Sequence, residues 1–387
     1  GVGVNMVTRR GTDEFRGAGR FLSAKKNGLG FFSQSSPDIS CGDAGPGQDC
    51  DDIGSKGLRD IREYGFEAGG PALVDRVWLW GSWGTNDIKS TAVGGGNDDT
   101  ILENTSVKLN WQISSANSFL ASWNNGDKQK FGRLSGPSFQ TEATWDQRGP
   151  SAIWKFEDTH VFSSSFYLTG AYSKTDLGFS LTSKAQLAAG TATNTSESLL
   201  DSDGIWKDSF LAGYSRRPED TFKIDGSYFF NTGDTSHELK FGTRLRTSTG
   251  ASNFIWPGRN IHHYAGEIFG GPTGAQIGLP QLGDAPDFFA VTRQPQDQPL
   301  ETEYTSLWLQ DTIATGNWTF NAGFRYDLQE GTIGGTDSSV VDPTFATTLP
   351  TVSAGDTDPG FDWETIHPRL GATYALGEDR GTLLRGS

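Results

Sequence analysis

The stretch "NWTFNAGFRYDLQ" (residues 317–329) separates its apolar and polar side chains by parity. The even-numbered positions from Trp318 to Tyr326 are apolar or aromatic, whereas the odd-numbered positions from Thr319 to Asp327 are small, polar or charged. Side chains of a strand point alternately to its two faces, so this period of two predicts a β-strand with one apolar face. That face must meet either a protein core or a lipid bilayer.

The same period recurs along the whole chain and predicts an all-β fold. Thirteen strands are expected at 14–22, 61–69, 77–84, 104–112, 118–124, 151–157, 161–173, 221–231, 238–248, 302–314, 317–328, 366–376 and from 382 onward. The alternation is clear in "FKIDGSYFF" (222–230) and "HELKFGTRLR" (237–246). The polar side of these strands includes Lys240, Arg244, Arg246, Arg325 and Asp327, which we expect to face a water-filled interior.

The connections between these strands alternate strictly in length. The long ones span 23–60, 85–103, 125–150, 174–220, 249–301 and 329–364, and the short ones span 70–76, 113–117, 158–160, 232–237, 315–316 and 377–381. Alternate connections of an up-and-down sheet lie on one edge, as in transmembrane β-barrels with short turns and long loops. The crossovers of a soluble sandwich mix both lengths. We therefore predict an antiparallel transmembrane β-barrel, and we assign 205–216 to a loop, with a strand extension as the alternative.

Composition excludes two other classes of protein. The mean hydropathy is −0.48, and no apolar run approaches the roughly 18–20 residues of a membrane-spanning helix. The formal net charge of −15 argues against a nucleic-acid partner, because phosphate binding needs clustered lysine and arginine. Between 329 and 364 there are acidic residues but no lysine or arginine, so this loop must be solvated or bound to cations.

No catalytic constellation stands out, and we do not expect an enzyme. Only two cysteines occur, Cys41 and Cys50 in "CGDAGPGQDC". Their close spacing in a Gly- and Asp-rich loop favours a disulfide over a metal site and indicates an oxidising compartment. The five histidines are scattered, and no G-x-S-x-G or H-E-x-x-H pattern is present.

The long loops carry the candidates for ligand contact. Aromatic and histidine residues there are substrate candidates: Trp145, Trp256, His262, His263 and Tyr264. Adjacent histidines point to opposite faces of a strand, so His262 and His263 would hold one metal ion only from a turn. Acidic residues offer weak calcium candidates: Asp49, Asp51, Asp52, Asp356, Asp358 and Asp362. None of them has EF-hand spacing, so a solvated acidic surface without metal or cofactor is the expectation.

The N-terminal stretch "GVGVNMVTRRGTDEFRGAGRFL" (1–22) resembles TonB-dependent outer-membrane receptors at the junction between the last plug strand and the first barrel strand. The pattern is carried by Asn5, Thr8, Arg9, Arg10 and Gly11. Other stretches resemble the Oar-like branch of this family, whose members usually carry a carboxypeptidase-regulatory-like domain. These stretches are "YGFEAGGPALVDRVWLWGSW" (64–83), "HELKFGTRL" (237–245), "YTSLWLQDTIATGNWTFNAGFRYD" (304–327) and "HPRLGATYALGEDRGTLLRGS" (367–387).

The resemblance implies a division into the end of a plug domain (1–13) and a partial barrel (14–387) with thirteen of the family's 22 strands. It also implies substrate capture by the loops and import driven by an inner-membrane TonB–ExbB–ExbD complex. The plug arginines Arg9 and Arg10 would pair with barrel carboxylates, for which Asp225 and Asp327 are candidates. Outer-membrane lipid and an extracellular substrate are the other expected partners.

Two alternatives stay open at the sequence level. A passive porin-like channel shares the barrel but needs no plug, so residues 1–13 argue against it. A secreted soluble all-β binding or adhesion protein explains the disulfide and the polar loops but not their strict alternation. The identity of the substrate does not follow from the sequence, because specificity depends on loop geometry.

Overall fold

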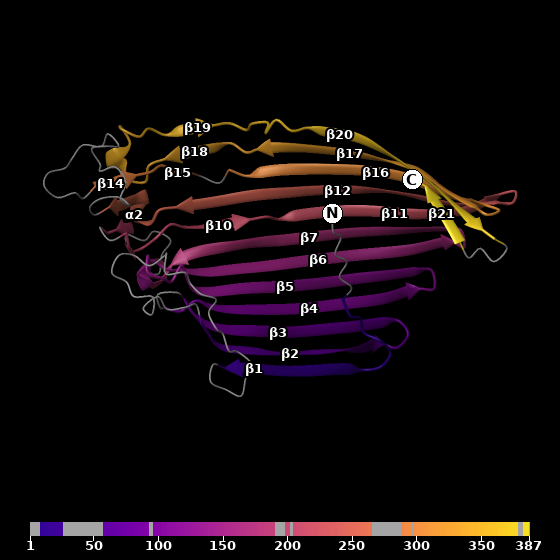
Figure 1. The fold of residues 1–387 in the computed structure, drawn as a ribbon, viewed down its shortest axis with the longest axis horizontal. Coiled ribbons are helices and arrows are strands. Elements are labelled where there is room, and N and C mark those ends of the chain that lie inside the picture. Colours follow the sequence, from indigo (N-terminus) through magenta and orange to yellow (C-terminus); the bar gives the residue numbers. More distant parts are fainter. Residues whose placement is uncertain are drawn as a thin grey trace.

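The computed structural model describes residues 8–25, 57–92, 96–189, 198–201, 204–264, 288–295, 298–377 and 382–386. Most of them belong to one 14-stranded antiparallel sheet, whose strands follow one another almost entirely in chain order (Figure 1). These strands are β1 (Arg16–Lys25), β2 (Gly57–Leu73), β3 (Val77–Thr91), β4 (Asp99–Ser114), β5 (Asn117–Arg133), β6 (Trp145–Ser163), β7 (Phe166–Ser183), β10 (Ala212–Arg216), β11 (Glu219–Thr232), β12 (Thr235–Ile255), β16 (Leu300–Thr315), β17 (Trp318–Ile333), β20 (Trp363–Leu376) and β21 (Thr382–Gly386). The predicted all-β fold is confirmed.

Two strands, the five-residue β10 and the 14-residue β11, share one position in this sheet. Both pair with β7 on one side and with β12 on the other. Between them lies Pro218, which has no N–H to donate to a neighbouring strand. Together they form one interrupted strand, so the 14 strands fill the thirteen positions that the sequence predicts. Residues 212–216, which we assigned to a loop, are the first part of that strand.

One edge of the sheet carries tight turns and the other carries long connections (Figure 1, right and left). Turns of two or three residues join β2 to β3, β4 to β5, β6 to β7, β11 to β12 and β16 to β17. The long connections follow β1, β3, β5, β7, β12 and β17. This one-sided arrangement agrees with the alternation predicted from the sequence.

One predicted turn is misplaced. Residues 158–160 lie inside β6, and 164–165 form the turn to β7. The polar side chains at 158–160 suggested a turn, but they are bonded across the sheet. Asn117 donates from Nδ2 to the two carboxylate oxygens of Asp158 at 3.0 and 3.1 Å, and the same atom lies 3.2 Å from Nδ1 of His160. Polar residues with partners on the next strand therefore do not end a strand.

Several strands run beyond their predicted ends at the edge with long connections. β12 reaches Ile255 instead of 248, and β6 begins at Trp145 instead of 151. A strand needs about 9–11 residues to cross a membrane, whereas β12 has 21. Its outer part, 247–253, is polar on both faces and lacks the alternation used for the prediction. Backbone pairing with β10 and β16 keeps it in the sheet.

The two faces of the sheet differ as the alternation requires. On the apolar face, side chains of neighbouring strands lie side by side, as Leu309 does with Phe241 and with Phe324. Many of these side chains remain exposed; Phe66 is 61% exposed and Phe324 46%. Contiguous exposed apolar surface of this extent marks contact with a membrane or a partner. The opposite face is polar and includes the row Lys223, Arg244, Ser306 and Asp327 on four adjacent strands.

Aromatic rings line the apolar face close to the tight turns. The ring of Phe166 lies 5.1 Å from that of Phe162 and 6.3 Å from that of Tyr228, between centroids. Further along this edge, Trp318 lies 4.6 Å from Tyr374. Aromatic girdles at both interfaces flank the apolar band of outer-membrane barrels. The row of rings near the tight turns therefore has the position of such a girdle.

The described residues form an open sheet with two end strands. β1 pairs with β2 and β21 pairs with β20, and neither has a second partner in the described residues. No helix in that part of the chain is long and apolar enough to cross a membrane. Several sequence candidates lie outside the described residues: Asn5, Cys41, Cys50, Asp49, Asp51 and Asp52.

Candidate functional site

Residues 8–13 lie against the polar face of β2, β3 and β4. Lys108 donates from Nζ to the carbonyl oxygen of Thr8 at 3.2 Å and to its hydroxyl at 3.1 Å. Arg9 forms an ion pair with Glu67. At Gly11, which is buried, a Cβ atom would lie 2.4 Å from the carbonyl oxygen of Leu79, so only glycine allows this close approach. The segment is therefore attached to the sheet by charge, hydrogen bonds and shape.

These contacts correct the expected partners of the two arginines. Arg9 pairs with Glu67, not with Asp225 or Asp327. Arg10 lines a hollow with Trp78 and Glu157, also on the polar face. The two expected carboxylates lie on distant strands, where cations of their own strands hold them. The expected type of partner, a carboxylate of the barrel, is correct for Arg9. The sequence does not show which strands lie beneath residues 8–13.

Asp13 fixes the end of the segment to the turn between β2 and β3. Its Oδ1 accepts hydrogen bonds from the backbone N–H of Asp75 at 3.0 Å and from Nε1 of Trp78 at 2.7 Å. These bonds favour the ionised carboxyl, first through the Asp75 N–H and then through the Trp78 indole, and lower the pKa of Asp13 below its usual value. Because the pKa is lowered in the folded state, the contact stabilises the fold at pH values above the usual pKa of an aspartate. This stabilisation is lost as the pH falls through the lowered pKa.

We expect Asp13→Asn to loosen this attachment at neutral pH. The neutral amide accepts weaker hydrogen bonds than the carboxylate, so the Asp75 amide should exchange with deuterium severalfold faster. In the wild type, protonation of Asp13 at acid pH adds a pH dependence to this exchange, on top of that of the chemical exchange step. The variant should lack this added dependence. Glu14→Gln is the matched control, because the Glu14 carboxylate pairs with the exposed Arg16 and with no other side chain among the described residues. Unchanged protection of Asp75 in Asp13→Asn would contradict the assignment.

The second region of interest is the polar face of β11, β12, β16, β17 and β20. All five residues predicted to face the interior lie there: Lys240, Arg244, Arg246, Arg325 and Asp327. Arg325 is fixed by Asp327, to whose oxygens its Nε donates at 2.8 and 3.0 Å, and by the hydroxyl of Tyr304 at 2.6 Å. The cations on this face thus meet both carboxylates and aromatic rings.

The other predicted cations differ in their partners. Lys240 lies 3.0 Å from Glu238 on its own strand. Arg246 lies 3.9 Å from Glu219 and 4.9 Å from the ring centroid of Tyr304. Arg244 has no hydrogen-bond or ion-pair partner among the described residues, and its Nε is buried. It lines a hollow, the Arg244 hollow, together with Lys223, Asp225, Trp308, Leu309, Gln310, Phe324, Arg325 and Arg369.

Sequence reasoning did not single out Trp308 and Arg369. Both occupy polar-face positions, since Trp308 pairs with Arg325 and Arg369 pairs with Gly323 in register. The parity of "YTSLWLQD" (304–311) places an indole on the polar side, which is the signal that could have identified it. The parity of 366–376 likewise places Arg369 on the polar side, but its place in the hollow required the register of β20 against β17.

The edge with long connections holds an aromatic cluster, in which the substrate candidates Trp145 and Trp256 come together. Phe210 lies at its centre, with ring centroids 5.3 Å from each of these two indoles. Trp206 lies 4.9 Å from Phe210 and 5.2 Å from Trp256, and Phe139 lies 5.0 Å from Phe210. The cluster joins the connections after β5, β7 and β12.

Backbone pairing between short strands also links the connections after β7 and β12. β13 (Ile261–Tyr264) pairs with β8 (Ser198–Leu200) and with β14 (Phe288–Val291), and β8 pairs with β9 (Trp206–Asp208). The shorter helices α1 (Lys184–Ala189) and α2 (Pro257–Asn260) lie in the same connections. His262, His263 and Tyr264 belong to an extended strand, which is not the turn that a shared metal ion would require.

The calcium candidates that the structure describes bind backbone groups. Asp356 accepts from the N–H of Gly335 at 2.7 Å, and Asp358 accepts from that of Gly360 at 2.7 Å. Asp362 follows them before β20. A small three-stranded sheet orders this region. It consists of β15 (Gln294–Pro295), β18 (Thr336–Ser339) and β19 (Val352–Ala354). Within the described residues, no group of three or more His, Cys, Asp or Glu side chains could hold a metal ion.

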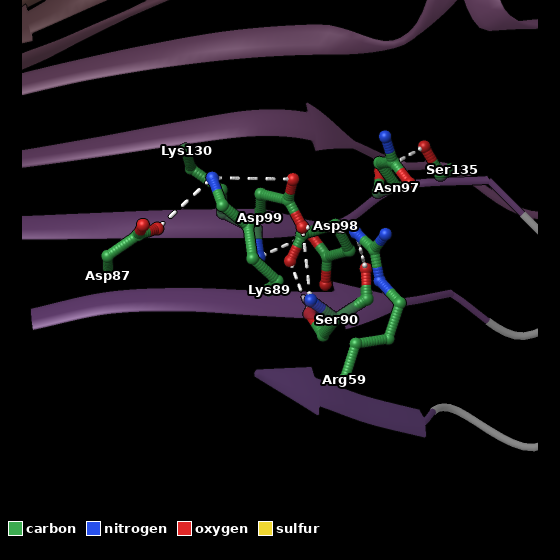
Figure 2. A network of polar contacts seen from close by, with 9 residues as sticks. All are labelled: Arg59, Asp87, Lys89, Ser90, Asn97, Asp98, Asp99, Lys130 and Ser135. Atoms are coloured by element: carbon green, nitrogen blue, oxygen red, sulfur yellow. Dashed lines mark hydrogen bonds and ion pairs between the residues drawn. The ribbon is translucent and has the colours of Figure 1, made fainter. Parts of the chain in front are cut away.

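A network of ion pairs orders the connection between β3 and β4 (Figure 2). Asp99 accepts from Nη2 of Arg59 at 2.7 Å and from the backbone N–H of Ser90 at 3.0 Å, and it lies 3.7 Å from Nζ of Lys89. Asp98 forms an ion pair with Lys130 of β5. All of these residues lie in segments predicted as loops, yet their charges join the outer ends of β2 to β5.

Comparison with known proteins identifies the framework. The family described as "Outer membrane beta barrel domain" matches residues 85–387. The chain belongs to this family. The outer membrane is therefore its location, and the apolar side of 317–329 meets lipid. This location also removes the secreted soluble alternative.

Solved structures share the fold of this outer-membrane β-barrel protein. The outer membrane transporter YddB from Escherichia coli superposes with a TM-score of 0.53 at 10% identity, over 82% of this chain and 45% of that one. The ferric citrate transporter FecA in its unliganded form gives 0.50 at 14% identity, over 96% and 44%. The chain spans about half the length of these proteins or less. No curated protein matches the sequence.

In an outer-membrane barrel the tight turns face the periplasm and the long loops face outward. The aromatic cluster and the ion-pair network therefore lie at the extracellular side. The polar face, with residues 8–13 and the Arg244 hollow, is the lumen face. These are the two regions that a solute crossing the barrel would meet.

Proposed function

We propose that this chain is the barrel part of a TonB-dependent outer-membrane receptor of the Oar-like branch. The receptor binds an extracellular substrate through its loops and imports it past a plug domain with energy from a TonB–ExbB–ExbD complex. The observation that supports this most directly is the attachment of residues 8–13 to the lumen face through Arg9, Gly11 and Asp13. A passive channel has no need of such a segment attached to its lumen face.

The loop edge supports substrate capture at the outer side. Its connections are ordered by the aromatic cluster around Phe210 and by strand pairing, which provides a preformed surface. Preformed surfaces bind with a smaller loss of conformational entropy than flexible loops do. The lumen cations then act on a solute that has passed this surface, because charged rings in a pore set its selectivity.

The proposed function predicts that uptake depends on both the receptor and TonB. We would compare the solutes that the bacterium removes from its medium in the parent strain, a strain deleted for the complete gene, and a strain lacking TonB. The expected result is a solute that the parent consumes and both mutants leave behind. Asp13→Asn and Glu14→Gln versions, restored to the deleted strain, connect the uptake to the segment at 8–13.

The alternatives give other results. A solute whose removal depends on this gene but not on TonB would make the protein a passive porin-like channel. If neither deletion changed the removal of any solute, import as the function of this barrel would be wrong. Equal surface levels of the barrel in all complemented strains, measured on intact cells, are required for either conclusion.

A further inference from the structure

The Arg244 hollow has an excess of positive charge in a chain that is strongly acidic overall. Four of its lining residues are cations: Lys223, Arg244, Arg325 and Arg369. Lys223 forms an ion pair with Asp225, and Arg325 forms one with Asp327. Arg244 and Arg369 have no carboxylate partner among the described residues. Carboxylates are abundant in this protein, with 47 Asp and Glu against 32 Lys and Arg, yet none within the described residues pairs with these two guanidiniums.

Arg244 is the more informative of the two. Its Nε is buried and has no acceptor in the described part of the chain. A buried donor without a partner costs the desolvation of that group, and in native proteins such groups usually have a functional explanation. Its neighbours in register are Lys223 on β11 and Ser306 on β16, so the adjacent strands supply a second cation and a small side chain. The register neighbours on the adjacent strands thus supply no carboxylate to the guanidinium.

Trp308 forms an aromatic wall beside these cations. A Cβ atom at Gly242 would lie 2.3 Å from the Trp308 ring, so glycine lets the indole lie directly against the backbone of β12. Nζ of Lys223 lies 5.9 Å from the ring centroid, and Cζ of Arg325 lies 5.8 Å from it. Both distances are within the range of cation–π attraction. The paired cations hold the indole in place, while the unpaired guanidiniums remain available.

We propose that the Arg244 hollow binds a carboxylate group of a small solute, with Arg244 and Arg369 as the donors and Trp308 as the adjoining wall. A guanidinium presents its N–H groups in a planar fork that matches the two oxygens of a carboxylate. Asp225 and Asp327 are engaged by Lys223 and Arg325, so they position those cations and do not neutralise the hollow. The inference rests on the proposed function only in that the hollow faces the path of the imported solute.

A carboxylate side chain of a polypeptide that fills the lumen has the same chemistry, and the test must separate the two sources. The complete protein in lipid nanodiscs is titrated with succinate, with chloride added to hold the ionic strength constant. Saturation-transfer difference NMR of the succinate methylene signal measures binding. Succinamide, the neutral isostere, shows whether the charge is required.

The expected result is a saturable succinate signal in the wild-type protein and none with succinamide. Arg244→Gln and Arg369→Gln should each raise the succinate Kd about tenfold or more, because each removes charge-assisted hydrogen bonds. Lys240→Gln is the matched control: it removes a positive charge from the same strand as Arg244, but Lys240 pairs with Glu238 and does not line the hollow. Its Kd should equal that of the wild type.

Equal Kd values in the wild type and both arginine variants would overturn the proposal. So would the absence of a saturable signal in the wild type. If that absence came with a lower melting temperature for Arg244→Gln than for Lys240→Gln, the donors would serve a carboxylate of the polypeptide instead of a solute. TonB-dependent uptake without succinate binding would overturn this inference and leave the proposed function standing. Succinate binding without TonB-dependent uptake would overturn the proposed function and leave this inference standing.

Discussion

Val107→Lys is expected to destabilise the folded barrel by about 2–4 kcal/mol, the cost of a lysine side chain at the middle of the membrane on the lipid face. Val107 lies on β4, is 45% exposed, and pairs with Gly81 and Trp123 on the apolar face. It is four residues from Trp111 at the turn edge. At the rise of about 3.3 Å per residue and a tilt of about 40°, this is about 10 Å into the apolar band.

The matched control is a lysine on the other face of the same strand. Asn110→Lys places the same side chain on the lumen face, in the hollow that Arg10 and Glu157 line. There it lies off the lipid face, between the cation Arg10 and the carboxylate of Glu157, so we expect a change within about 1 kcal/mol. Urea titration of both variants, folded into lipid vesicles, measures the difference. Equal midpoints for the two variants would mean that the apolar face of β4 does not meet lipid.

Much of this framework follows from the sequence because the lipid and the lumen impose it residue by residue. A strand between two solvents alternates in polarity, and alternate connections differ in length, so thirteen strand positions and their faces were predictable. The outer ends of the strands were not, because 247–253 of β12 has small or polar residues on both faces and no polarity pattern. Residues 158–160 show the opposite error: their polar side chains predict a turn, although they are bonded across the sheet inside β6.

The candidate sites were predictable in type but not in arrangement. Parity predicts that Arg244 and Arg325 lie on the lumen face. It does not predict that Arg325 is paired and Arg244 is not, because this depends on which carboxylates reach them. Asp327 is two residues from Arg325 on one strand, where a local rule could find it. The pairing of Arg9 with Glu67 and the joining of Trp145 with Trp256 depend on register between distant strands, which no local pattern encodes.

Phe210→Ala is expected to release the extracellular connections while leaving the barrel intact. Phe210 contacts the rings of Phe139, Trp145, Trp206 and Trp256, which come from three different connections. Removing a buried phenylalanine costs about 3–5 kcal/mol, and for this half-buried ring we expect about 2 kcal/mol. That loss raises the population of opened loops about 30-fold, because each 1.4 kcal/mol is a factor of ten.

Trypsin cleavage after Lys207 is the measurement for this prediction. Lys207 follows Trp206 in the cluster and is held by an ion pair with Asp201 at 2.6 Å, so cleavage there requires the loops to open. Under conditions in which opening is fast compared with cleavage, the rate follows the opened population, and it should rise about 30-fold in Phe210→Ala. Phe361→Ala, which removes a loop aromatic that packs on Trp363 and against Gly331, outside the cluster, should leave it unchanged. If the two variants were cleaved at the same rate after Lys207, Phe210 would not join the loops, and the preformed surface proposed for substrate capture would lose its physical basis.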